Sequence, residues 1–221
     1  MTDISEGDDT LTQRLRAGEV QALAELFAMH QARLWRMVNF RLDRRLLGRV
    51  DPDDVLQDGY LAAAQRIQHY AAVTAMSPFV WLRLIVSQTL VDVHRHHLGA
   101  QLRDAGREVA IQAGGGEQTT SASLAIHLAD SLTSPSQAAQ RAEAIVQVEK
   151  AIADMDPIDQ EVLALRHFEE LTNGEVAEVL GIQRKAASIR YFRAIRRLKT
   201  IMAGVPGFLD DAGDGEEPEH G

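Results

Sequence analysis

Hydrophobic residues recur at intervals of three or four along most of the chain, which is the spacing of one buried face of an α-helix. The longest stretch of this kind follows Glu19, and further stretches follow Asp51 and Ser77. Both residues are good N-caps, and each precedes a proline, which suits the first position of a helix. Alternation typical of strands is scarce. We therefore expect an all-α fold.

The same spacing predicts where the helices begin and end. A short helix is expected over 10–17, a long one from Glu19, a third from Asp51, and a loop over 69–76. The helix that starts at Ser77 should end near Leu98, and Pro135 and Pro157 should each open another.

Residues 172–199 carry the clearest local pattern. Thr172 and Glu175 form a capping box, and Gly181 permits the left-handed residue that ends a short helix. A second helix follows Gln183, and no acidic residue lies between it and Lys199. The inner face of this helix comprises Ala187, Tyr191, Ala194 and Leu198. A Gly-containing turn between two helices, the second one basic, predicts a helix-turn-helix.

An alternative interpretation is a solvated basic helix on an ordinary bundle. Small residues on the outward side, Ala186 and Ser188, disfavour it because they let the backbone and the arginines approach a DNA groove.

Residues 99–136 differ in composition from the rest. They include Gly114, Gly115 and Gly116 and few large hydrophobic residues, so they are expected to be a flexible linker. This predicts two small helical domains, 10–98 and 137–203, with acidic tails at 1–9 and 204–221, of which the first is expected to be disordered. The C-terminal domain should be a winged-helix-like four-helix domain.

Charge is distributed unevenly over the 221 residues. The net charge is −9, but the two tails hold ten acidic residues and no Lys or Arg, so the body between them carries +1. There is no cysteine, no secretory signal and no hydrophobic run near the ~20 residues of a membrane span, so we expect a cytoplasmic protein with no membrane association. No nucleophile elbow, P-loop or HExxH motif occurs, so neither an enzyme nor a cofactor is expected.

Three segments together resemble the extracytoplasmic-function type of RNA polymerase sigma factor, in the sigma-70 family. DPDDVLQDGYLAAA is similar to the family's second-region helix, and SPFVWLRLIVSQTLVDVHRH to its promoter-melting helix. EVAEVLGI, followed by the basic helix, is similar to its fourth region. The family has Asn where this chain has Gln88, often Gly-Thr-Val at 185–187, and Leu at Tyr191, so the DNA sequence that it reads does not carry over.

The resemblance implies a sigma factor that binds core RNA polymerase and directs transcription from promoters by reading their −35 and −10 elements. It implies region 2 at 10–98 and region 4 at 137–203, and an anti-sigma factor as a further partner. The second-region helix would dock on a coiled coil of the largest polymerase subunit through Asp51, Asp54, Gln57, Asp58 and Leu61. A solvated acidic helix start is the alternative interpretation of these residues.

The implied DNA contacts form two sets. At the −10 element they are Tyr70, in the predicted loop, with Trp81, Gln88, Asp92, Arg95 and His96. Trp81 is as well explained as a core residue. At the −35 element they are Arg166, Thr172, Glu175, Gln183, Arg184, Lys185, Ala186, Ser188, Ile189, Arg190 and Arg193.

Three other interpretations stay open at this point. The run of residues 94–97, HRHH, with Asp92 offers metal-ligand atoms, but Arg95 in its middle disfavours a cation, so no metal site is predicted. A dimeric helix-turn-helix regulator would bind a palindromic site without polymerase. An interaction protein such as an anti-sigma factor is disfavoured by the basic helix.

Overall fold

The computed structural model describes residues 3–70, 76–104, 124, 145–146, 148–150 and 152–203. Every regular element in these ranges is a helix, and no strand occurs among them. The predicted all-α class is confirmed. Of the predicted linker, only residues 99–104 and Leu124 are described, and the predicted start at Pro135 lies outside the described residues.

The chain forms two compact units. Unit 1 comprises residues 1–113 and 165–187, and unit 2 comprises residues 114–164 and 188–221. The division into helical domains at 10–98 and 137–203, with tails and a linker, stays a prediction.

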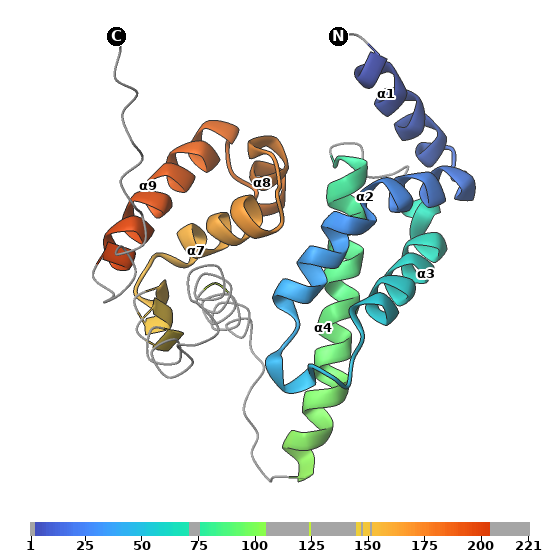
Figure 1. Ribbon diagram of the computed structural model, residues 1–221. Helices are drawn as coiled ribbons and strands as arrows, with labels where there is room; N and C mark the ends of the chain where they lie inside the picture. Colours follow the sequence, from blue (N-terminus) through green and yellow to red (C-terminus); the bar gives the residue numbers. More distant parts are fainter. Residues whose placement is uncertain are drawn as a thin grey trace, which may run out of the picture. The chain divides into compact units, whose positions relative to one another are not determined.

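Unit 1 is built on three long helices, α2 (Val20–Arg41), α3 (Pro52–Tyr70) and α4 (Pro78–Asp104). They pack against one another, and α1 (Asp3–Arg16) contacts α2 and α3 (Figure 1). A 3-10 turn, η1 (Arg44–Leu46), lies between α2 and α3. The packing is close where α3 meets α4, because a Cβ at Gly59 would lie 2.9 Å from Cγ2 of the buried Val86. A glycine at this position lets the two backbones approach.

The predicted starts of α2, α3 and α4 agree with the structure, as do those of the helices that begin at residues 157, 173 and 184, but three other boundaries were wrong. Asp51 caps α3 by accepting a hydrogen bond from the Asp53 amide at 2.9 Å. However, α1 begins at Asp3, inside the segment expected to be a disordered tail, because acidic residues suit the positive N-terminal end of a helix. Helix α3 includes His69 and Tyr70, and α4 continues to Asp104, since good helix formers follow Gly99.

The C-terminal helices follow the capping pattern closely. Asp156 accepts a hydrogen bond from the Ile158 amide at 2.9 Å and starts α7 (Pro157–Leu163). A π-helical turn, η3 (Ala164–Phe168), follows. Thr172 and Glu175 form the predicted capping box of α8 (Asn173–Leu180), and α9 (Arg184–Ala203) comes after the turn. The predicted helix-turn-helix pattern is present.

The turn between α8 and α9 depends on one backbone conformation. Gly181 has φ of 62°, which is favourable for glycine and costs other residues roughly 1–2 kcal/mol. No atom lies within 4 Å of a Cβ placed there, so the cost of a side chain would come from the backbone alone. Gly174, in the first turn of α8, has room for a Cβ, with Thr172 Oγ1 nearest at 3.8 Å.

We therefore expect the same substitution to have opposite effects at these two glycines. Gly181→Ala should lower the free energy of unfolding by about 1 kcal/mol, whereas Gly174→Ala should raise it by up to about 1 kcal/mol because alanine favours a helix. Urea denaturation of the full chain, followed by circular dichroism at 222 nm, measures both. Equal effects of the two substitutions would contradict this explanation of the turn.

Candidate polymerase and nucleic-acid interface

The residues predicted to bind polymerase lie together on one exposed face. Four of them lie on α3 at intervals of three, one and three, which places them on one side of the helix: Asp54, Gln57, Asp58 and Leu61. All four are exposed, and so is Asp51 just before the helix. Val55, Leu56 and Ala63 on the opposite side are buried. We call these five exposed residues the docking face. It combines carboxylates, an amide and one large hydrophobic side chain.

Four of the residues predicted at the −10 element also share a face. Gln88, Asp92, Arg95 and His96 are exposed along α4. We call these four the melting face. Gln88 accepts a hydrogen bond from Arg66 of α3 at 2.8 Å, and Arg95 lies 3.7 Å from Asp92. The face therefore carries both signs of charge.

A hollow joins the two faces. It has a volume of about 390 Å³ and lies where α3 and α4 run together. Asp58 of the docking face lines it, as do Gln88, Asp92 and His96 of the melting face. Arg66 contributes a positive charge to the same lining. The two predicted sets thus meet in one place, which their positions in the sequence do not reveal.

The two aromatic residues predicted at the −10 element do not lie on this surface. Tyr70 is fully buried at the end of α3, and its ring lies 4.9 Å from that of Trp81, which is also buried. The Tyr70 hydroxyl donates a hydrogen bond to the Met76 carbonyl at 3.2 Å. The prediction that Tyr70 lies in an open loop was wrong, because α3 continues through it, and Trp81 is a core residue in this structure.

The HRHH motif is divided between one part-buried residue and exposed ones. His94 Nε2 accepts a hydrogen bond from the Asp43 amide at 3.2 Å, and burial lowers the pKa of its imidazole. His96 and His97 are exposed and line the hollow. Among the residues that the structure describes, no group of three or more His, Asp or Glu side chains could hold a metal ion.

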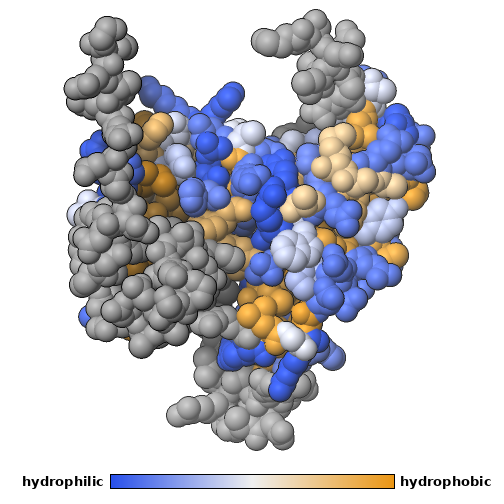
Figure 2. Space-filling view, in the orientation of Figure 1, coloured by the Kyte–Doolittle hydropathy of each residue, from blue (hydrophilic) through white to orange (hydrophobic). Residues whose placement is uncertain are grey.

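Helix α9 presents a basic outward face. Gln183, Arg184, Lys185 and Ile189 are exposed near its start, while Ala187, Ala194 and Leu198 are buried on the opposite side. Phe192, which was not among the predicted contacts, lies on the outward face and is 67% exposed. The helical spacing could have predicted this exposure, because it places Phe192 on the side of α9 opposite the buried Ala187 and Ala194. Figure 2 shows how hydrophobic residues reach the surface in small patches among hydrophilic ones.

Two of the predicted −35 contacts are held by a carboxylate of α7. Asp159 accepts hydrogen bonds from Arg190 Nη1 at 2.9 Å and from Arg193 Nε and Nη2, both at 2.8 Å. The exposed fractions of the Arg190 and Arg193 side chains are 27% and 57%. Arg193 therefore combines a fixed position with a large exposed area.

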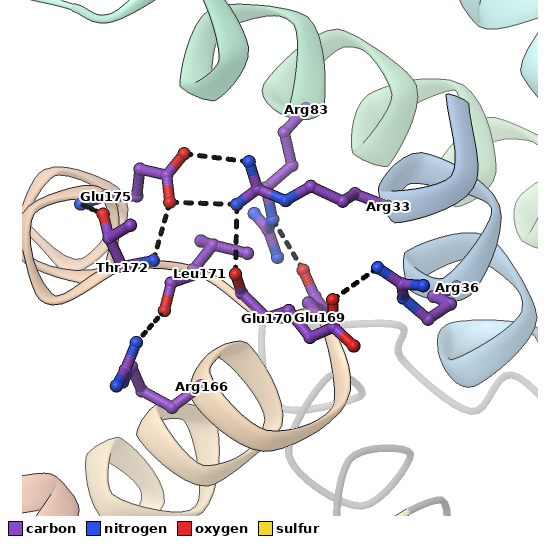
Figure 3. A network of polar contacts seen from close by, with 9 residues as sticks. All are labelled: Arg33, Arg36, Arg83, Arg166, Glu169, Glu170, Leu171, Thr172 and Glu175. Atoms are coloured by element: carbon purple, nitrogen blue, oxygen red, sulfur yellow. Dashed lines mark hydrogen bonds and ion pairs between the residues drawn. The ribbon is translucent and has the colours of Figure 1, made fainter. Parts of the chain in front are cut away.

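Three other predicted −35 residues belong to a polar network inside unit 1 (Figure 3). The two terminal nitrogens of Arg33 in α2 donate to the Glu175 carboxylate at 3.2 and 2.9 Å, and one of them also donates to the Glu170 carbonyl at 3.2 Å. Glu175 in turn accepts from the Thr172 amide at 2.6 Å. Arg166 donates to the Leu171 carbonyl. These polar groups are engaged within the protein.

Glu169 is the most deeply buried part of this network. Its side chain is 1% exposed and accepts from Arg41 Nε at 2.6 Å and from Arg83 Nε at 2.7 Å. Burial by itself raises the pKa of the carboxyl, but the two arginines outweigh it and hold the pKa below its ordinary value. No local sequence pattern indicates this site, because the two arginines lie more than 80 positions away from Glu169 in the chain.

Comparison with known proteins identifies one segment. Residues 151–200 match the family described as Sigma-70, region 4. This match confirms the predicted resemblance of the C-terminal helices to the fourth region of a sigma factor.

The other comparisons add little to that match. A solved structure, CnrH in complex with the cytosolic domain of CnrY, is similar with 20% identity and a TM-score of 0.49, over 89% of this chain and 97% of that one. No curated protein matches the chain. In the described ranges, each helix is too short or too polar to cross a membrane.

We expect Glu169→Gln to lower the free energy of unfolding at pH 7 by about 3–5 kcal/mol, because it leaves the buried Arg83 and the part-buried Arg41 without this carboxylate. A carboxyl whose pKa is lowered by folding stabilises the fold above its unfolded-state pKa of about 4.3, and the contribution disappears as the pH falls through the folded-state value. The difference between wild type and Glu169→Gln should therefore shrink below about pH 4.

Urea denaturation between pH 3 and pH 7 measures this difference. Glu170→Gln is the matched control, because the Glu170 carboxylate pairs with Arg36 at 2.6 Å at an exposed position. The control should cost no more than about 1 kcal/mol. If both substitutions lower the free energy of unfolding equally, burial does not determine how much the Glu169 ion pairs contribute to stability.

Proposed function

We propose that this chain is an extracytoplasmic-function sigma factor of the sigma-70 family. In this proposal it binds core RNA polymerase in the cytoplasm and directs it to promoters by their −35 and −10 elements. The observation that carries the proposal is the region 4 match at 151–200, which includes the basic helix α9. The resemblance of the N-terminal helices to region 2 supports it.

The docking face is the proposed contact with polymerase. Its exposed carboxylates would pair with basic residues of a coiled coil in the largest subunit, and complementary charge would set both the register and the rate of association. Leu61 would add the hydrophobic contact that such an interface needs at its centre. The exposure of all five residues supports this assignment over a purely structural role.

The melting face is the proposed contact with the −10 element. Gln88 presents an amide that could bind a base edge, while Arg95 and His96 are suited to phosphates. Tyr70 and Trp81 support α3 and α4 from the core in this structure, so a base contact by either would require the side chain to leave its buried position.

Helix α9 is the proposed reader of the −35 element, in the major groove of duplex DNA. The exposed side chains Arg184, Lys185 and Arg193 can bind phosphates or guanine, and Ile189 and Phe192 can contact thymine methyl groups. Thr172 and Glu175 would brace the DNA backbone only after release from Arg33 and from the cap. The resemblance further implies an anti-sigma factor as a protein antagonist.

A run-off transcription assay tests the proposal as a whole. Core polymerase with the full chain, on a library of genomic fragments, should yield discrete transcripts that core polymerase alone does not. A dimeric regulator that acts without polymerase docking would bind a palindromic site and add no such transcripts. Failure of the chain to co-purify with core polymerase would contradict the proposal.

Charge reversal tests the docking face. Asp54→Lys with Asp58→Lys should weaken binding to core polymerase about 100-fold or more, taking about 1.5 kcal/mol for each lost charge pair. Fluorescence anisotropy of a labelled chain titrated with core polymerase measures the affinity.

Asp53→Lys is the matched control for Asp54→Lys. Both carboxylates are exposed in the first turn of α3, but Asp53 lies off the docking face. The control should bind as the wild type does. The assignment of the face is wrong if the double reversal retains wild-type affinity, or if Asp53→Lys weakens binding as much as Asp54→Lys.

A further inference from the structure

Asp159 of α7 is a nearly buried carboxylate that faces the basic helix α9 within unit 2. Its side chain is 7% exposed. Three nitrogens of two arginines donate to it at 2.8–2.9 Å. Asp156, the N-cap of α7, lies farther away, at 3.7 Å from Arg190 Nη1. Charge-assisted hydrogen bonds of this length are among the stronger ones in proteins.

The atoms involved determine what each arginine can still do. Asp159 takes the side edge of the Arg193 guanidinium, formed by Nε and Nη2. A guanidinium is a planar fork with five N–H donors, so its end edge, formed by Nη1 and Nη2, points away from the carboxylate. The Arg193 side chain is 57% exposed, whereas that of Arg190 is 27% exposed. Arg193 is therefore anchored on one side and presented on the other.

An arginine with a fixed side chain and one with a mobile side chain favour different groups of DNA. A mobile arginine binds any phosphate, and that binding carries no sequence information. An arginine whose plane is fixed meets the O6 and N7 acceptors of guanine with both donors of its end edge at once. Part of the ordering entropy is then lost on folding, before DNA binds.

We propose that Asp159 is a positioning residue for DNA recognition by α9. It orients Arg193 so that the end edge of the guanidinium reads a guanine in the major groove, and it reduces binding of Arg190 and Arg193 to phosphates. The proposal rests on the proposed function, in which α9 reads the −35 element, and adds the residue and the base that determine part of its specificity.

The test uses the full chain with core polymerase and a duplex pool randomised in the upstream promoter element. Wild type should select an element with a preferred guanine that Arg193→Ala no longer selects. Asp159→Asn should lose preference at that same position by roughly 5- to 100-fold and keep the others. Because Asn is neutral, the log–log salt slope for binding of the full chain to random-sequence duplex should become steeper by about one.

Two further variants keep the test decisive. Asp156→Asn removes a neighbouring charge but retains a good N-cap, so it should leave the guanine preference unchanged. Arg193→Lys keeps the charge and loses the fork, so it should lose the guanine preference without changing the salt slope. If Asp159→Asn fails to fold, this variant still tests whether the fork of Arg193 reads the guanine.

The outcomes separate this inference from the proposed function. The inference is overturned if Asp159→Asn folds and retains the wild-type guanine preference, or if Arg193→Lys does so. It is also overturned if Asp159→Asn alters a different position from Arg193→Ala. If wild type with core polymerase selects no upstream element at all, the proposed function itself fails.

Discussion

A charge removed from water is tolerated only when opposite charges and hydrogen bonds compensate for the lost solvation. Glu169 is such a charge, and two arginines compensate for it, Arg41 on α2 and Arg83 on α4. Removing Glu169 would leave Arg83, whose side chain is 8% exposed, without this carboxylate. The ion pairs of Glu169 with these two arginines therefore restrict the position of the segment that precedes α8. The next residue, Glu170, has φ of 56°, a conformation uncommon for non-glycine residues, and the hydrogen bond from Arg33 to its carbonyl helps to hold it.

Asp159 uses the same chemistry for a different purpose. Both acids accept hydrogen bonds from two arginines, so each acid has one positive charge in excess of its own, and Asp156, 3.7 Å from Arg190, offsets part of this excess at the Asp159 site. Around Glu169 that excess lies in side chains that are at most 18% exposed, and it contributes to the fold. Around Asp159 part of it reaches the surface through Arg193. Whether an acid paired with two arginines can help to bind DNA therefore depends on how exposed the arginines are, more than on the ion pairs themselves.

Local sequence patterns predicted most of the helix starts and the exposed faces of the helices. They predicted few of the ion pairs. Capping and periodicity foretold the starts of α3, α7 and α8 and the left-handed Gly181, because each depends on residues within one or two turns. They also foretold that Asp54, Gln57, Asp58 and Leu61 are exposed on α3 and that Gln88, Asp92, Arg95 and His96 lie off the core side of α4, whereas Trp81 proved to be buried. The partners of Glu169 and Glu175 could not be foreseen, since no local rule connects α2 with a turn some 130 residues later. Tyr70 was misjudged because its burial depends on Trp81, which follows in another helix.

The hollow between α3 and α4 has a consequence for how the two proposed faces can be used. Asp58 and Gln88 line the same volume of about 390 Å³, and Arg66 lies in its wall while donating to Gln88. Asp92 of the melting face lines the same hollow, so Arg66 shares this lining with carboxylates of both proposed faces. If each face binds its partner as proposed, a charge brought to one face acts on Arg66 and, through it, on the other face. Any coupling of this kind must act equally in both directions.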